Sequence, residues 1–225
     1  MAEQRKKLNR MRKLIGENMR QSNINNPKTS GFGLYDFTEL LEMKQELEAA
    51  GRKVSDTVIF LKAIALTLKE YPAMNARLEG DECIVYDSIN PGIAVDTPRG
   101  LITLTLRDTQ DKSLMDLAED FRALMHRMRD GKLTADDYTG STYTISNLSR
   151  TSGGFFTSII NNNECFIIGF GGIHKQAMVL ENDVIAARSV CYVTVNANHV
   201  LVDGVETGKF MERLREILEH PKRYM

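Results

Sequence analysis

Residues 189–219 constrain the fold of this chain more than any other segment of the sequence. They begin with an apolar run, residues 189–195, whose β-branched and aromatic side chains are typical of a buried strand. A turn with the pattern His-x-x-x-Asp-Gly follows at His199, and amphipathic residues 205–219 then predict a helix that stops before Pro221. A buried strand followed by a capped amphipathic helix predicts a domain in which helices pack against a sheet.

His199 and Asp203 are the candidate functional residues of this turn. An imidazole has an unperturbed pKa near neutrality, so His199 is a candidate general base. Asp203 directly precedes the predicted helix, and with Glu206 three residues later it forms the pattern of a capping box. A histidine at a strand end is also often an ordinary polar residue. The turn alone therefore leaves a catalytic and a purely structural interpretation open.

The rest of the chain alternates between predicted helices and strands. Apolar residues at helical spacing, together with N-cap residues and terminal glycines, predict helices at residues 8–22, 38–51, 56–71 and 113–130. Short β-branched or aromatic runs predict strands at residues 32–37, 82–86, 92–95, 101–106, 141–146 and 165–170. Residues 23–27 are rich in asparagine and predict a loop. This mixture indicates an α/β or α+β domain whose sheet is covered by helices.

Size and charge exclude several classes of protein. A chain of 225 residues is long enough for one sizeable core, and its formal net charge of −1 argues against a dedicated nucleic-acid binder. No apolar run is long enough to span a membrane, and the first residues lack the apolar region of a secretory signal. Although the first 20 residues include seven Lys or Arg, the stripe of Leu8, Met11, Ile15 and Met19 predicts a packing helix rather than a targeting segment.

The three cysteines indicate the chemical setting of the chain. Cys83, Cys165 and Cys191 are odd in number and contain no Cys-x-x-Cys pair, which argues against a disulfide framework and a zinc site. Cys165 and Cys191 lie among apolar residues and are predicted to be buried thiols. We therefore expect no metal site and a reducing, cytoplasmic location.

Ser146 is the third candidate site residue. The strand predicted at residues 141–146 ends at this serine, where a loop containing Gly153 and Gly154 begins. A hydroxyl at a strand end can donate a hydrogen bond to a substrate. It can equally be an ordinary serine beside a turn formed by Asn147.

Seven short motifs in the same order resemble the catalytic domain of the dihydrolipoamide acyltransferases of 2-oxo acid dehydrogenase complexes. They lie at residues 9–15, 36–40, 96–101 (Asp-Thr-Pro-Arg-Gly-Leu), 131–133, 144–147 (Thr-Ile-Ser-Asn), 159–161 and 199–204. The resemblance extends from about Leu8 to Pro221. It implies the fold that this family shares with chloramphenicol acetyltransferase, an α/β two-layer sandwich with a mixed sheet covered by helices.

The resemblance also implies an activity and roles for the site residues. The activity is the transfer of an acyl group between coenzyme A, as a substrate, and a dihydrolipoyl thiol whose lipoyl group is carried on another domain or chain. His199 resembles the general base that takes the thiol proton, and Ser146 resembles the donor that stabilises the tetrahedral oxyanion. Asp203 resembles a carboxylate that organises the site, and Arg12 is its expected ion-pair partner.

An assembly is implied in the same way. The resemblance predicts a homotrimer in which one chain supplies His199 and its neighbour supplies Ser146. Trimers can build further into a cubic core, for which Tyr224 and Met225 are candidate docking residues. The expected partner is a lipoyl carrier protein or domain, with no nucleic-acid or membrane partner. We expect residues 1–225 to be a single acyltransferase catalytic domain with no lipoyl or peripheral-subunit-binding domain, either cut from a longer protein or acting alone.

The chain departs from the family pattern at three places. The family usually has Asp-His-Arg where this chain has Asn198, His199 and Val200, so the charges that flank the histidine are missing. A Pro-His element is replaced by Pro27 and Lys28. An Asn-Pro-Pro-like segment is replaced by residues 161–164, Asn-Asn-Asn-Glu. The last two changes leave the identity of the acyl group open.

Other polar residues have weaker claims to a site. His126 lies among arginines on a predicted helix and is expected to be solvated, and His174 is expected to have a turn role. The phosphates of coenzyme A need basic side chains or helix N-termini, which the sequence does not single out.

Two alternatives to the acyltransferase remain. One is a catalytically weak or silent trimeric core that acts as an assembly scaffold, which the altered residues around His199 favour. The other is an O-acetyltransferase of the chloramphenicol acetyltransferase type. The motifs at residues 96–101 and 144–147 favour the dehydrogenase-complex family over that type.

Overall fold

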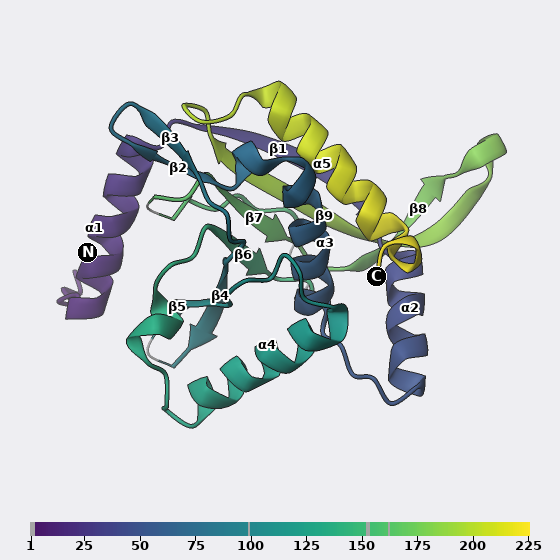
Figure 1. The fold of residues 1–225 in the computed structure, drawn as a ribbon, viewed down its shortest axis with the longest axis horizontal. Helices are drawn as coiled ribbons and strands as arrows, with labels where there is room; N and C mark the ends of the chain where they lie inside the picture. Colours follow the sequence, from purple (N-terminus) through teal and green to yellow (C-terminus); the bar gives the residue numbers. More distant parts are fainter. Residues whose placement is uncertain (1–2, 99, 152–153, 162) are drawn as a thin grey trace.

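A seven-stranded mixed sheet forms the centre of the molecule in the computed structural model (Figure 1). The structure describes residues 3–98, 100–151, 154–161 and 163–225, so Arg99, Gly153 and Asn162 of the predicted motifs lie outside the described residues. The strand order is β1-β9-β7-β6-β4-β5, and β8 also pairs with β9. The strands are β1 (Lys28–Asp36), β4 (Pro91–Thr97), β5 (Gly100–Thr105), β6 (Tyr143–Asn147), β7 (Phe166–Phe170), β8 (His174–Val179) and β9 (Ile185–Asn198). β6 runs parallel to both β4 and β7, and the other pairs are antiparallel, which confirms the predicted mixed sheet.

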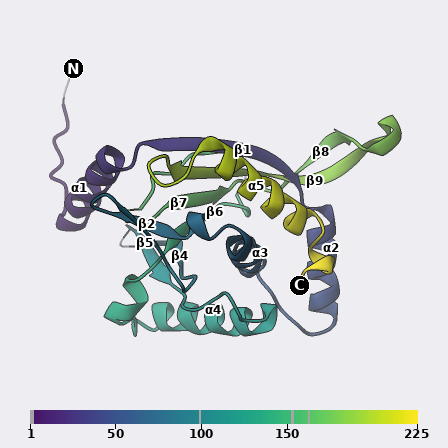
Figure 2. The same ribbon diagram turned by 45° about the horizontal axis from the view of Figure 1, so that its top comes forward.

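The described residues form five α-helices, and the third of them is the most deeply buried. They are α1 (Arg10–Asn25), α2 (Thr38–Ala49), α3 (Asp56–Glu70), α4 (Leu114–Arg129) and α5 (Gly204–Glu219). α3 lies between the sheet and α4 (Figure 2), and most of its residues are buried, as its uniformly apolar sequence predicts. Phe60 of α3 stacks on Phe170 of β7 with ring centroids 3.9 Å apart. None of the described helices is long and apolar enough to cross a membrane.

The two faces of the sheet differ in chemistry because side chains alternate along each strand. Ile145, Ile168 and Val195 point to the face that packs on the helices, and all three belong to the buried core. Their neighbours Ser146 and Thr194 therefore point to the opposite face.

The predicted helix starts are confirmed at the caps. Ser55 accepts a hydrogen bond from the Val58 N–H at the start of α3, and Ser113 forms a capping box with Asp116 at the start of α4. Gly131 adopts φ +67 just after α4, which is the left-handed conformation expected at a helix end.

Two boundaries and two strands differ from the prediction. α1 continues to Asn25, so residues 23–25 are helical rather than loop, because the Asn26 N–H still bonds to the Ser22 carbonyl. The strand predicted at residues 82–86 is confirmed as β3 (Glu82–Val85), but its hairpin partner β2 (Ala76–Glu79) was not predicted, and neither was β8. β9 is also twice as long as the predicted run, and its first half forms with β8 an arm that projects from the body in both views (Figures 1 and 2).

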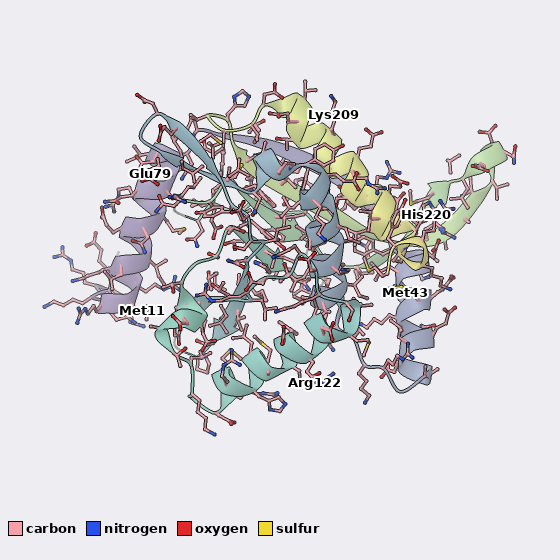
Figure 3. All side chains as sticks on the ribbon, viewed as in Figure 1. Met11, Met43, Glu79, Arg122, Lys209 and His220 are labelled. Carbon is pink, nitrogen blue, oxygen red and sulfur yellow. The ribbon has the colours of Figure 1, made fainter. Side chains whose placement is uncertain are left out.

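The apolar stripe of α1 does not pack on the core of its own chain. Leu8 is 63% exposed and Met11 46% exposed, and Ser22 is the one buried residue of the helix. Figure 1 places α1 at the margin of the molecule, and Met11, labelled in Figure 3, borders a hollow with Asp96 and Thr97 at the end of β4. The prediction of a packing helix is therefore not met within a single chain.

Candidate active site

His199 lies on a tight turn between β9 and α5. Its N–H donates to the Pro27 carbonyl at 2.8 Å, and the next N–H, of Val200, donates to Asn198 Oδ1 at 3.0 Å. The N–H of Leu201 then donates to the Asn198 carbonyl at 3.0 Å. Successive backbone donors are thus satisfied, while the His199 side chain is exposed. The arrangement presents an imidazole from a backbone that has little freedom to move.

Asp203 caps α5, as the sequence predicts. Its Oδ1 accepts the N–H groups of Val205 at 2.8 Å and Glu206 at 2.9 Å, and Glu206 completes the capping box by accepting the Asp203 N–H. The hydrogen bond from the Glu206 N–H is the largest of the causes that lower the pKa of Asp203, with Val205, His199 and Lys209 adding to it. The carboxylate is therefore held ionised and oriented by the first turn of the helix.

The predicted ion pair of Asp203 with Arg12 is not among the ion pairs of the described residues. Asp203 is exposed, and Arg12 borders a hollow with Asp96 and Pro98 at the turn between β4 and β5. The organising role of Asp203 in a single chain is therefore the cap of α5, rather than a buried charge pair.

Ser146 lies on β6 at the centre of the sheet, one residue before the strand ends. It is half-buried, and its hydroxyl has no hydrogen-bond partner among the described residues. The next residue, Asn147, fixes the strand end, since its Nδ2 donates to Thr57 Oγ1 at 3.0 Å and its Oδ1 accepts the Ser149 N–H at 2.8 Å. The hydroxyl of Ser146 is consequently available on a well-held strand.

The strand register separates Ser146 from His199 within one chain. Ser146 is paired with Gly169 of β7, and Gly169 is paired with Thr194 of β9. His199 comes five residues after Thr194. At ordinary strand rise and spacing this is about 17 Å along the strands and about 10 Å across them, so the two side chains lie roughly 20 Å apart. One chain does not bring these two residues to a common reacting atom.

A groove of about 660 Å³ opens beside the strand end that carries Ser146. α2, α4 and the N-terminus of α3 form its walls, and Asn147 lies at its edge. Its basic side chains are Lys44, Lys53, Arg122 and Arg150. Figure 3 shows Arg122 on α4.

The charges in the groove leave it positive. Lys44 is paired with the buried carboxylate of Asp56, and Glu48 is the other acidic residue of the lining. Lys53, Arg122 and Arg150 are exposed, and the positive end of the α3 dipole adds to their field. A basic groove at a helix N-terminus is suited to phosphate groups.

Several residues that the sequence singled out lie away from this chemistry. Cys165 and Cys191 are buried as predicted, and burial raises the pKa of each thiol to about 12, which keeps both unreactive at neutral pH. His126 is exposed on α4, as expected. His174 begins β8 rather than only a turn, and its Nδ1 lies 3.0 Å from the Gly172 carbonyl oxygen.

Sequence reasoning missed the groove and a buried carboxyl group. The groove residues come from segments far apart in the chain, and no local pattern joins them. Glu164 is 2% exposed, and its Oε1 accepts hydrogen bonds from Ser141 Oγ at 2.6 Å and Asn161 Nδ2 at 3.3 Å. Burial raises the pKa of Glu164 to about 7. The sequence held one signal for this buried carboxyl group: Glu164 is a charged residue directly before the apolar strand predicted at residues 165–170.

Comparison with known proteins identifies what this fold and site resemble. Over residues 1–225 the chain matches the family model described as 2-oxoacid dehydrogenases acyltransferase (catalytic domain). It is 33% identical over 228 residues to the succinyltransferase component of the mitochondrial 2-oxoglutarate dehydrogenase complex of Saccharomyces cerevisiae, covering 99% of this chain and 49% of that protein. The chain spans about half the length of the curated relatives it matches.

Solved structures give the same picture. The Azotobacter vinelandii dihydrolipoamide acetyltransferase is 30% identical with a TM-score of 0.91, covering 99% of this chain and 93% of that one. The study of that protein concerns a serine, a histidine and an asparagine in its catalytic mechanism, with the asparagine four residues after the histidine. The cubic core of a pyruvate dehydrogenase multienzyme complex has a TM-score of 0.91 at 29% identity, covering 99% and 93% of the two chains. Chloramphenicol acetyltransferase, at 18% identity and a TM-score of 0.56 over 90% and 94% of the chains, shares the fold.

Proposed function

The chain belongs to the family of 2-oxo acid dehydrogenase acyltransferases, as their catalytic domain, and from this membership we propose that it transfers an acyl group between coenzyme A and a dihydrolipoyl thiol. The observation that carries the proposal is that two side chains on well-held backbone, those of His199 and Ser146, are free to contact a substrate. His199 is exposed on a hydrogen-bonded turn, and Ser146 presents a hydroxyl without a partner among the described residues.

His199 acts in this proposal as the general base. Its imidazole takes the proton from the attacking thiol, and the resulting thiolate forms a bond to the thioester carbonyl carbon of the other carrier. The tetrahedral oxyanion accepts a hydrogen bond from Ser146 Oγ, a contribution of ~3 kcal/mol in comparable sites. When the original carbon–sulfur bond breaks, the imidazolium returns the proton to the departing sulfur. No covalent acyl-enzyme is needed, which agrees with the buried, unreactive state of Cys165 and Cys191.

Asp203 acts as a positioning residue. In the Azotobacter protein the asparagine lies four residues after the histidine, and Asp203 has the same spacing from His199 here. Because Asp203 holds the first turn of α5, it also holds the end of the turn that carries the imidazole. This role accounts for an aspartate or an asparagine at that position, since both cap helices well.

The basic groove supplies the place for coenzyme A. Phosphates of the cofactor would meet Lys53, Arg122 and Arg150, and the N-terminus of α3 faces the same space. Asn147 lines this groove and is next to Ser146 in β6. Because consecutive side chains of a strand point to opposite faces, the thiol arm would pass the end of β6 to reach the Ser146 hydroxyl.

The strand register supports a trimer with shared active sites as part of this proposal. With roughly 20 Å between Ser146 and His199 in one chain, their joint action in this proposal takes the two residues from different copies of the chain. Exposed apolar side chains support such an interface, among them Phe32 at 54%, Phe155 at 63% and the stripe of α1. Phe32 is paired with Thr194, in the same row of residues as Ser146.

The relatives support a larger setting for the proposed enzyme. The acyl carrier is a lipoyl group on another domain or chain, and residues 1–225 act as a single catalytic domain. The solved cubic core supports assembly beyond the trimer. Tyr224 and Met225 pack against the core of their own chain, and the Tyr224 hydroxyl donates to Glu216 Oε1 at 2.5 Å, which disfavours them as docking residues. A cytoplasmic location stays a prediction, since the yeast relative is mitochondrial.

An acyl-transfer assay tests this function directly. The protein is mixed with dihydrolipoamide and with acetyl-, succinyl- or branched-chain acyl-CoA, and release of the coenzyme A thiol is followed for wild type, His199→Ala and Ser146→Ala. We expect transfer with at least one donor and a loss of about 10²–10³ in kcat for Ser146→Ala. Equal rates for wild type and His199→Ala with every donor would contradict the proposal and favour the scaffold alternative.

A further inference from the structure

A continuous chain of buried polar side chains links the end of α1 to the turn that carries His199. Asn198, the last residue of β9, is 1% exposed, and its Nδ2 donates to Asn26 Oδ1 at 2.9 Å. Asn26 Nδ2 in turn donates to the Ser22 carbonyl at 2.9 Å and to Ser22 Oγ at 3.0 Å. Ser22 Oγ then donates to the Ile160 carbonyl in the loop before β7. The three side chains are buried polar groups with satisfied bonds, although they belong to segments distant in sequence.

The direction of every hydrogen bond in this chain is determined by its neighbours. Asn198 Oδ1 accepts the Val200 N–H, so its Nδ2 is the atom that faces Asn26. Asn26 Nδ2 is occupied by Ser22, so Asn26 presents its oxygen to Asn198. An amide donor at position 198 and an amide acceptor at position 26 therefore require each other. An aspartate at position 198 would place one acceptor against another in a buried place.

The same residues hold both sides of His199. Asn198 binds the turn through its side chain and its carbonyl, and Pro27, which follows Asn26, accepts the His199 N–H. α1 contributes one buried residue, Ser22, so this chain of hydrogen bonds is also the anchor of α1 to the domain.

We propose that the buried amide pair Asn198–Asn26 is the positioning element of the catalytic histidine, fixing the His199 turn against the end of α1. The proposal rests on the assignment of His199 as the base. It adds two positioning residues, neither of which touches substrate. Since misplacement of a catalytic group by about 1 Å can cost up to a hundredfold in rate, loosening this turn lowers kcat without removing any reacting atom.

Three variants test the pair in the acyl-transfer assay. Asn26→Ala removes the acceptor but keeps the Asn198 side chain, and we expect the loosened turn to lower kcat about tenfold while KM for coenzyme A changes less than about twofold. Asn198→Asp opposes two acceptors and should lower kcat further. The double variant carries both Asn26→Ala and Asn198→Asp, so the aspartate at position 198 no longer faces a second acceptor. Its kcat should equal that of Asn26→Ala, and should not show the loss obtained by multiplying the two single losses.

Hydrogen exchange of the His199 and Val200 amides gives a readout that does not depend on activity. Exchange at both amides should speed up in Asn26→Ala, whereas Asn23→Ala, an exposed asparagine of the same helix, should match wild type in exchange and in kcat. If Asn198→Asp does not fold, the kcat and the exchange rates of Asn26→Ala still test the proposal.

The results separate this inference from the proposed function. Wild-type kcat and wild-type exchange in Asn26→Ala, with His199→Ala inactive, would overturn the positioning role alone. Purely additive losses in the double variant, or a loss explained fully by the fraction of unfolded protein, would also overturn it. Equal activity of His199→Ala and wild type would instead remove the proposed function on which the inference depends.

Discussion

Asp203 orients the start of α5 through hydrogen bonds of its side chain. Its carboxylate accepts two N–H groups at the start of α5, and these bonds together with His199 and Lys209 lower its pKa. The side chain is exposed and its hydrogen bonds are local, so its effect is on the orientation of the turn at residues 199–203.

Substitution of Asp203 separates capping from charge. Asp203→Asn keeps a cap of similar quality, and we expect its melting temperature and kcat to stay near those of wild type. Asp203→Ala removes the acceptor and should lower the melting temperature by roughly 2–4 °C together with kcat. Thermal melts and acyl-transfer rates check this, and a large kcat loss in Asp203→Asn with an unchanged melting temperature would instead point to a chemical role for the charge.

Arg122 tests the coenzyme A groove at the scale of one side chain. Loss of a hydrogen bond to a phosphate costs about 1.5 kcal/mol or more, so Arg122→Ala should raise KM for acyl-CoA by roughly tenfold with little change in kcat. Arg129→Ala, on the same helix but outside the groove lining, serves as the matched control. Similar KM values for the two variants would contradict the placement of coenzyme A in this groove.

At the scale of elements, the segment from Ile160 to the start of β7 contacts both the end of α1 and the last residue of β9, which precedes His199. Ser22 bonds to the Ile160 carbonyl at one end of this segment, and the Asn198 N–H bonds to the Cys165 carbonyl at the other, at 2.7 Å. Between them Glu164 is buried, with Oε2 lacking a partner among the described residues. Burial and the nearby Glu164 carboxyl raise the pKa of Tyr143 well above its usual range.

The titration of Glu164 makes stability depend on pH. Its pKa rises from an ordinary 4.5 to about 7 on folding, so between these values the unfolded chain has released a proton that the folded chain retains. The free energy of unfolding therefore falls as pH rises through this window, by on the order of 3 kcal/mol, and changes little above it. Glu164→Gln keeps an acceptor for Ser141 and should remove this slope.

Denaturant unfolding at pH 5 and pH 8 measures the effect. Wild type should lose stability between the two values, and Glu164→Gln should lose much less. Glu82→Gln, an exposed glutamate on β3, should behave like wild type. Identical pH dependence in wild type and Glu164→Gln would rule out Glu164 as the titrating group.

The sequence predicted elements that carry their own local signals and missed those that do not. Helix starts at Ser55, Ser113 and Asp203 were predictable because capping is local in the chain. β8 has mostly exposed residues and no apolar pattern, so its pairing with β9 creates the strand. The bond between Asn26 and Asn198 joins residues 172 positions apart, which no local pattern can predict.

At the scale of the whole molecule, the sheet register keeps Ser146 and His199 roughly 20 Å apart within one chain. The family resemblance predicted a shared site, and the register supplies a physical reason for it, since β7 lies between β6 and β9. In the proposed trimer, a closed symmetric assembly would bring Ser146 of one chain to His199 of the next and repeat the same site at every interface.

Mixing two inactive variants tests this shared site most directly. Ser146→Ala and His199→Ala chains are unfolded together, refolded as mixed trimers, and assayed for acyl transfer beside each variant refolded alone. If each site combines His199 of one chain with Ser146 of another, about a quarter of the sites in a one-to-one mixture carry both residues, and activity should return to about a quarter of wild type. Mixed trimers that stay as inactive as the separate variants would contradict the account.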